Sequence, residues 1–293
     1  MDFAFSDEQR QLRDAVGAYL RRYPGTHGRD RFDGARHYER WKSMAEDLGL
    51  GTLAIPHERN GLGGDPVNTM IVMEEFGWAL VVEPFIETVV VAGRLLVGSL
   101  RDLQCGDLDQ IADGSHRYAV AHFETEGDTR VTARREGDGW RLLGTKSMVM
   151  AAPWAERLVV SATEAGSADA TGPAMLFVIE RDAPGVGMDA FSTIDGRCAA
   201  DLRFDDVRLD NGALLSTGDK AAMRLEEALD AARAAQAAEA VGIMRRMLRD
   251  TTDYTLGRRQ FGKALADFQV SRHRMTDMAM QIERATSALY LGT

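Results

Sequence analysis

The sequence has few of the residues that crosslinked or metal-centred small domains require. Its 293 residues include only two cysteines, Cys105 and Cys198, and neither belongs to a Cys-x-x-Cys pair or a cysteine–histidine cluster. A disulfide framework and a zinc site are therefore not indicated, and a reducing cytoplasmic location fits best. Five of the six histidines also show no metal-ligand spacing: His27, His37, His57, His116 and His273.

Long apolar runs and an excess of positive charge are missing as well. The longest apolar stretch, around residues 88–100, is short and carries Arg94, and the N-terminus opens acidic rather than basic. We therefore expect no membrane span and no signal peptide. The 35 basic and 45 acidic residues give a net charge of −10. Nucleic acid is not expected as a partner, because this charge repels a phosphate backbone.

The composition is that of a globular protein. Hydrophobic residues make up 45% and charged residues 27% of the chain, which argues against disorder, collagen and a coiled coil. A chain of this length exceeds one simple core, so more than one domain is expected.

The first part of the chain, residues 1–115, has helical patterns throughout. Residues 6–9, Ser-Asp-Glu-Gln, form a capping box ahead of apolar residues at helical spacing. Further helices are predicted at residues 38–48, 66–79 and 84–100. The glycine-rich segment 61–64 is interpreted as a loop, because no phosphate-binding spacing follows it.

The pattern changes to short β-like runs over residues 116–212. Residues 136–139, Glu-Gly-Asp-Gly, supply hairpin turn chemistry. This part is predicted to be an all-β domain, a small barrel or a sandwich. The runs are residues 118–121, 130–134, 140–143, 157–162, 174–180 and 201–209.

Residues 213–293 return to helical patterns. One long alanine-rich helix is predicted over residues 221–253 and a second over 268–291. Two amphipathic helices cannot enclose a core by themselves, so their apolar faces need helices from elsewhere in the chain or from another subunit. We therefore expect a multi-domain α+β protein with an incomplete C-terminal helical bundle, and an oligomer.

Several motifs in this α-β-α order have counterparts in one known family. They are the opening segment 1–9 (MDFAFSDEQ), residues 61–64 (GLGG), residues 73–77 (MEEFG) and residues 257–263 (GRRQFGK), which close the long helix. Over its whole length the chain resembles the acyl-CoA dehydrogenase family.

Three further stretches resemble a subgroup of that family. They are residues 69–77, 83–85 and 139–147, which have counterparts in small-subunit-like members such as the pimeloyl-CoA dehydrogenase small subunit.

The resemblance implies FAD as cofactor and an acyl-CoA thioester as substrate. In such chemistry a carboxylate removes the α-proton, flavin N5 accepts the β-hydride, and donors hold the thioester oxygen. It also implies an electron-accepting flavoprotein as a partner, and an assembly that is either a homo-oligomer or a hetero-oligomer with a second acyl-CoA dehydrogenase subunit.

The resemblance points to cofactor-binding residues near the end of the long helix. Arg258 matches the family arginine that reaches the flavin pyrophosphate of a neighbouring subunit. Phe261 matches an aromatic packed near the cofactor, Gln269 matches a glutamine near its ribityl or adenine side, and Gln260 lies within the same motif. The alternative is a solvated helix end at Arg258 and Arg259, with Phe261 plugging the bundle core.

A second set of candidates lies in the β part, where the sequence departs from the family. Most members carry a Thr-Glu-Pro segment and a serine-bearing loop after the first strand, whereas residues 121–128 read AHFETEGD. Ala121 and His122 are the candidates here, with His122 at the position of the flavin-facing threonine. A structural or exposed imidazole is the alternative. Met148 and Met150 stand at the positions of a Trp and a Thr beside the flavin, with core packing as the alternative.

No catalytic base can be named. The chain ends at Thr293, before the helices between which many members carry a glutamate. The other family position maps to Ala232. Glu239 lies seven residues further, roughly 10 Å along a helix, and Glu226 and Glu227 are expected to face solvent.

Three hypotheses follow from these residues. The first is an FAD-dependent acyl-CoA dehydrogenase with an interfacial site. The second is a non-catalytic partner subunit that lends Arg258, Phe261 and Gln269 to a companion's flavin. The third is a truncated, inactive family member.

Overall fold

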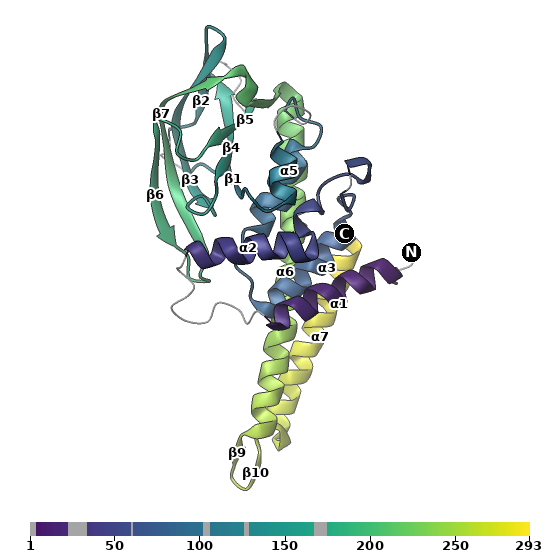
Figure 1. The fold of residues 1–293 in the computed structure, drawn as a ribbon. Helices are drawn as coiled ribbons and strands as arrows, with labels where there is room; N and C mark the ends of the chain where they lie inside the picture. The colour runs from purple at the N-terminus through teal and green to yellow at the C-terminus, as the bar shows by residue number, and fades with distance from the viewer. Residues whose placement is uncertain (1–3, 23–33, 60, 102–105, 126–128, 167–174) are drawn as a thin grey trace. The chain divides into compact units, whose positions relative to one another are not determined.

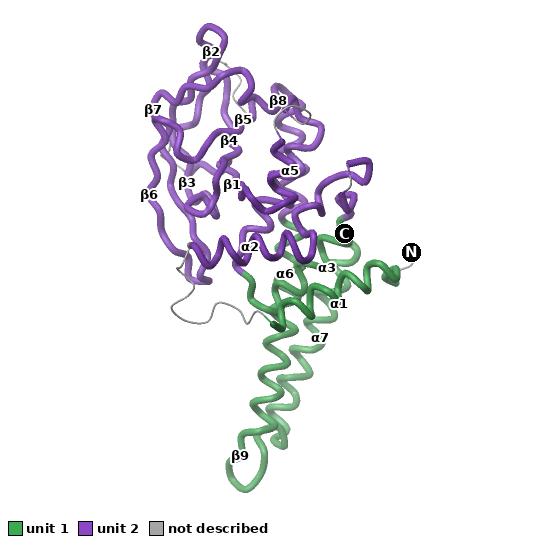
Figure 2. Tube along the Cα trace, in the orientation of Figure 1, with its two compact units in different colours: residues 1–27, 66–81, 233–293 green, residues 28–65, 82–232 purple. Residues whose placement is uncertain are grey.

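The computed structural model describes residues 4–22, 34–59, 61–101, 106–125, 129–166 and 175–293. Two compact units make up the chain (Figure 2): unit 1 contains residues 1–27, 66–81 and 233–293, and unit 2 contains residues 28–65 and 82–232.

The region before the β-strands is helical, as expected (Figure 1). One prediction needs correction, since residues 84–100 do not form one α-helix. A π-helix is followed there by a single α-helical turn. The elements are α1 (Asp7–Arg22), α2 (Gly34–Leu48), η2 (Leu50–Thr52), η3 (His57–Arg59), α3 (Pro66–Ala79), the π-helix η4 (Ile86–Gly93), α4 (Arg94–Leu96) and α5 (Asp107–Ala112).

The capping box at the start of α1 forms as predicted. The Gln9 amide donates to the Ser6 hydroxyl at 3.1 Å, and the Ser6 amide donates to Gln9 Oε1 at 3.0 Å. Two backbone donors are thereby satisfied reciprocally at the helix start.

Unit 1 is organised around a close crossing of α3 and α6 (Gly218–Gly257). A methyl group on Gly77 would overlap the carbonyl oxygen of Glu239, and one on Gly242 would overlap that of Glu74. The two helix backbones therefore touch at paired glycines. Next to the crossing, the Glu74 carboxylate is only 2% exposed. It accepts from Arg13 of α1 at 2.7 Å and from Arg245 of α6 at 2.9 Å.

In unit 1 the helix α7 (Gln269–Gly292) runs beside the end of α6 (Figure 1). The Thr252 and Thr255 hydroxyls of α6 lie 3.7 and 3.5 Å from the sulfur of Met275. The connection contains two short antiparallel strands and a 3₁₀ turn: β9 (Arg259–Gln260), β10 (Lys263–Ala264) and η6 (Leu265–Asp267).

The strands of unit 2 form one eight-stranded mixed sheet in the order β6-β7-β3-β2-β4-β5-β8, with β1 paired to β4. The β1–β4 and β2–β4 pairs are parallel and the others antiparallel; only two residue pairs join β2 to β4. The strands are β1 (Tyr118–Ala121), β2 (Thr132–Glu136), β3 (Gly139–Met150), β4 (Arg157–Glu164), β5 (Met175–Glu180), β6 (Val186–Ser192), β7 (Cys198–Asp210) and β8 (Leu214–Thr217).

Alternating side chains of these strands enclose one apolar core. It includes Trp140, whose ring packs edge-on against Phe177 with centroids 5.8 Å apart, and the buried Phe204. The expected hairpin turn joins Glu136 to Gly139. Its Gly137 has φ +57°, a conformation that favours glycine.

The order of a helical region, a β region and a helical region is confirmed. The domain ranges 1–115, 116–212 and 213–293 stay a prediction. Residues 214–217, expected to lie in the C-terminal helical region, instead form β8 against β5. In the part of the chain that the structure describes, every helix is too short or too polar to cross a membrane.

Candidate functional site

The candidate residues of the C-terminal region gather at the connection between α6 and α7. Arg258 follows α6, Gln260 lies on β9, Phe261 lies in the turn, and Gln269 begins α7. All four side chains are exposed. This group, the hairpin-tip residues, thus presents a guanidinium, an aromatic ring and two amides to the outside of unit 1.

Phe261 has two unusual features. Its side chain is 91% exposed, so it does not plug a bundle core. Its backbone has φ +51°, which costs of order 1 kcal/mol or more for a bulky residue. The hairpin therefore holds a large apolar ring in solvent in a strained conformation, with only an edge contact to Phe268 at 6.5 Å between centroids.

The two methionine candidates lie at the end of β3 in unit 2. Ser147 and Met148 face a single β7 residue, Asp201, which makes a bulge. Met148 has φ +49°, and its amide donates to Asp201 Oδ1 at 2.9 Å. Its side chain is 52% exposed, so the alternative of core packing is wrong for Met148, and the cofactor contact stays a prediction. Met150 is half-buried.

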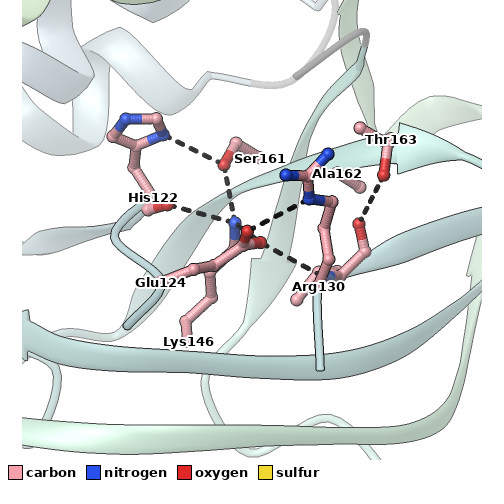
Figure 3. Close-up of a pocket in the computed structure, with 8 residues that line it drawn as sticks. His122, Glu124, Arg130, Lys146, Ser161, Ala162 and Thr163 are labelled. Carbon is pink, nitrogen blue, oxygen red and sulfur yellow. Dashed lines mark hydrogen bonds and ion pairs between the residues drawn. The ribbon is translucent and has the colours of Figure 1, made fainter. Parts of the chain in front are cut away.

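The candidates after β1 border a small pocket of about 90 Å³ in unit 2 (Figure 3). Ala121 ends β1 and is fully buried, and His122 follows it. The pocket wall consists of His122, Glu124, Arg130, Val131, Lys146, Ser161, Ala162 and Thr163.

The centre of this pocket is the ammonium group of Lys146, only 3% exposed. It donates to the His122 carbonyl at 3.1 Å, to Glu124 Oε1 at 2.7 Å and to Ser161 Oγ at 3.0 Å. Three acceptors match the three N–H donors of the group, which is what a buried charge requires. The Ser161 hydroxyl also lies 3.3 Å from Nδ1 of His122.

Three further contacts lie in the pocket wall. Glu124 Oε1 accepts from the Val131 amide at 3.2 Å, and Glu124 Oε2 lies 3.6 Å from Arg130 Nε. Thr163 donates to the Val131 carbonyl at 3.3 Å.

The sequence reasoning missed Lys146, Glu124 and Ser161 as site residues. Lys146 stands between Thr145 and Ser147 in the sequence, so no local pattern marks it as a buried charge. Its partner could not be named either, since Ser161 lies on another strand.

No carboxylate occupies the second family position of the base. Ala232 on α6 is buried. Glu226 and Glu227 are exposed, as expected. Glu239 is buried on α6 in unit 1, seven residues beyond Ala232.

Metal chemistry receives no support from the described residues, which contain no cluster of three or more histidine, cysteine or acidic side chains. His27 and Cys105 from the sequence reasoning, and residues 126–128 of the segment after β1, lie outside the described residues.

Two models of protein families match parts of the chain. The acyl-CoA dehydrogenase N-terminal domain matches residues 6–99, and the acyl-CoA dehydrogenase C-terminal domain matches residues 222–291. The chain belongs to the acyl-CoA dehydrogenase family. It is accordingly a flavoprotein oxidoreductase by type, and FAD is the cofactor of this family.

Individual members of the family agree with this assignment. FadE12, an acyl-CoA dehydrogenase of Mycobacterium tuberculosis, is 29% identical over 300 residues, which cover 97% of this chain and 75% of the relative. A glutaryl-coenzyme A dehydrogenase in complex with glutaryl-CoA superposes with a TM-score of 0.88 at 25% identity, over 100% of this chain and 77% of that one. A variant of the Tcur3481-Tcur3483 steroid ACAD superposes with a TM-score of 0.78 at 30% identity, over 98% and 77%.

Proposed function

We propose that this chain contributes to an FAD site at which an acyl-CoA thioester undergoes α,β-dehydrogenation, as part of an oligomer. The observation that carries the proposal is the hairpin tip: in a member of this family, Arg258 and Phe261 are held in solvent, and the described residues leave the Phe261 side chain 91% exposed.

The chemistry of the candidate residues fits this cofactor. A guanidinium offers a forked set of donors that suits a diphosphate. Phe261, and on the other unit Met148, are exposed apolar groups of the kind that pack on a flat ring. Gln260 and Gln269 offer both donors and acceptors to ribityl or adenine groups.

When bound, FAD supplies the acceptor for the β-hydride. The chain's own residues would hold the diphosphate at Arg258 and exclude water with Phe261. We assign no proton-removing residue, because the family position on α6 is Ala232.

The buried Ala232 favours a second candidate function, that of a non-catalytic partner subunit in a heteromeric dehydrogenase. One structural relative carries a two-part name, Tcur3481-Tcur3483. In this case the hairpin-tip residues serve a flavin whose catalytic carboxylate comes from the companion.

Two finer proposals, one on the subgroup and one on the electron acceptor, accompany the two candidate functions. The subgroup is that of small-subunit-like members such as the pimeloyl-CoA dehydrogenase small subunit, on the strength of residues 69–77, 83–85 and 139–147. Electrons leave the site to a separate electron-accepting flavoprotein.

Purification of the chain alone, with FAD supplied, tests the proposal. The absorbance of protein-bound flavin, the mass of the assembly and the reduction of a dye by a panel of acyl-CoA thioesters are measured together. The same measurements follow co-production with a second acyl-CoA dehydrogenase subunit from the same source.

The outcomes separate the two candidates. A yellow oligomer that oxidises an acyl-CoA by itself establishes the self-sufficient enzyme. A protein that becomes yellow only with the companion establishes the partner subunit. A chain that retains no flavin in either preparation overturns both.

A further inference from the structure

The pocket beside β1 contains a continuous chain of polar contacts that ends on an imidazole (Figure 3). It runs from the Glu124 carboxylate to Lys146 Nζ at 2.7 Å, on to Ser161 Oγ at 3.0 Å, and from there to His122 Nδ1 at 3.3 Å. Ser161 and Lys146 are both buried. All four residues belong to unit 2.

Proton accounting along this chain favours one arrangement. An ammonium has donors only, so Ser161 Oγ must accept from Lys146. The buried hydroxyl then has its own hydrogen left to donate, and among the described residues His122 Nδ1 is the acceptor within reach. Nδ1 then carries a lone pair, and the ring proton is on Nε2. A proton on Nδ1 would make Ser161 Oγ accept twice and would leave its buried hydrogen without an acceptor in the part of the chain that the structure describes.

We propose that Lys146 and Ser161 are positioning residues that fix His122 as a neutral imidazole with its proton on Nε2. The chain presents a donor of defined direction at the position after β1. The inference rests on the proposed function in one respect: within an FAD site, that Nε2–H would supply a donor to an acceptor atom of the flavin.

The ring of His122 in this arrangement differs from the ring of an ordinary exposed histidine. Such a side chain exchanges between two tautomers and gains a positive charge below about pH 6.5. Here the ring keeps one tautomer, because Lys146 sets the direction of the Ser161 hydrogen bond. The ring thereby retains one N–H donor, on Nε2.

Nitrogen-15 NMR of the full chain without cofactor tests the inference directly. The ring signals of His122 are assigned by comparison with His122→Gln. The test variant is Ser161→Ala, which removes the hydroxyl. The matched control is Thr163→Val, which removes another buried hydroxyl from the same pocket wall, one that bonds to the Val131 carbonyl.

We expect wild type and Thr163→Val to show a protonated Nε2 and an unprotonated Nδ1 at neutral pH, and Ser161→Ala to show a tautomer mixture or a charged ring. A wild-type ring that is charged or protonated on Nδ1 overturns the inference. So does a Ser161→Ala spectrum identical to that of wild type.

Addition of FAD then separates this inference from the proposed function. A change in the Nε2–H signal on flavin binding supports the donor role, and an unchanged signal with flavin bound overturns that role. If the chain binds no flavin even with a companion subunit, the proposed function fails, while the tautomer in the unliganded protein still decides whether the positioning is real.

Discussion

Asp107, at the start of α5 in unit 2, is a buried carboxylate with several polar and charged partners. Its carboxylate accepts from Arg101 Nε at 3.0 Å and from the Tyr118 hydroxyl at 2.8 Å, and it also contacts Arg157. Burial, with the nearby Asp107 charge, raises the pKa of Tyr118. One acid therefore pairs with two arginines and ties α5 to the first and fourth strands.

Replacement of Asp107 should lower the stability of the fold. We expect Asp107→Asn to lower the free energy of unfolding by about 3–5 kcal/mol, because Arg101 loses this counter-charge and Arg157 keeps the more exposed Glu180. Asp109→Asn on the same helix is the control, since Asp109 is exposed; its effect should stay within about 0.5 kcal/mol. Urea unfolding followed by circular dichroism measures both, and equal effects would contradict the assigned role of Asp107.

Cys198 gives a pH-dependent prediction. Burial, followed by the Glu87 charge, raises the pKa of this thiol to about 12. A thiol with a raised pKa in the fold contributes its full stability below its unfolded pKa of about 8.5, and this contribution disappears as the pH rises toward 12. Unfolding free energy should therefore fall above about pH 9.

Cys198→Ala isolates this contribution. The variant loses packing at every pH, but its stability should decline less steeply with pH than that of wild type, by at most about 1.4 kcal/mol per pH unit for one proton. Urea unfolding at a series of alkaline pH values measures the two slopes. Identical slopes would show that the native thiol is not shielded.

At the scale of elements, the crossing of α3 and α6 depends on two glycines. The carbonyl oxygens of Glu74 and Glu239 occupy the space where side chains at Gly242 and Gly77 would lie. Backbone atoms in helices cannot move aside as a flexible side chain can, so an added methyl group must separate the helices.

We expect Gly77→Ala and Gly242→Ala each to destabilise the protein by at least about 3 kcal/mol. Gly257→Ala is the control within α6, because no atom lies within 4 Å of the position its methyl would take. The control should be neutral or stabilising, by up to about 1 kcal/mol. Thermal and urea unfolding report the differences; an unaffected Gly77→Ala would show that the backbones are not in contact.

The sequence predicted those elements that depend on residues next to one another in the chain. The Ser6–Gln9 box, the turn after Glu136 and the helix starting at Pro66 were all recoverable from neighbouring residues. The strand β6 was missed because much of it is exposed and lacks alternation. The π-helix was missed because apolar residues at nearly every position leave no period to read.

Only part of the candidate site could be predicted from the sequence, because only part of it consists of residues that are adjacent in the chain. A motif of adjacent residues revealed Arg258 and Phe261. The Lys146 pocket depends on the pairing of β1 with β4, which brings Ser161 next to His122. Strand pairing of this kind is a tertiary property that spacing along the chain does not encode.

At the scale of the whole molecule, large apolar side chains remain exposed along the C-terminal helices of unit 1. Such a concentration is typical of a surface that another protein covers, which fits the oligomer expected from the sequence. They are Met247, Tyr254, Leu256, Phe261, Val270, Met280 and Leu291.

The proposed flavin site gives a prediction at this scale. Arg258→Gln should weaken FAD retention roughly 10- to 100-fold, because a charge-assisted bond to a diphosphate is worth about 1.5–3 kcal/mol. Arg249→Gln is the control, as Arg249 is an exposed arginine of the same helix that pairs with Asp253 at 2.9 Å. Flavin fluorescence during equilibrium dialysis measures retention, and sedimentation confirms that the assembly is unchanged. Equal retention in the two variants would contradict the role of Arg258.

The π-helix η4 marks a place where the chain has room for a change of length. Each of its hydrogen-bonded rings holds one residue more than an α-helical ring. Loss of Val90 would let the segment rewind as an ordinary α-helix while the residues on either side stay close to their present positions. Thr88 would keep its two bonds to the Tyr118 backbone, and Arg94 would keep its bond to the Gly64 carbonyl. A deletion of one residue here should therefore leave both anchors of the segment in place.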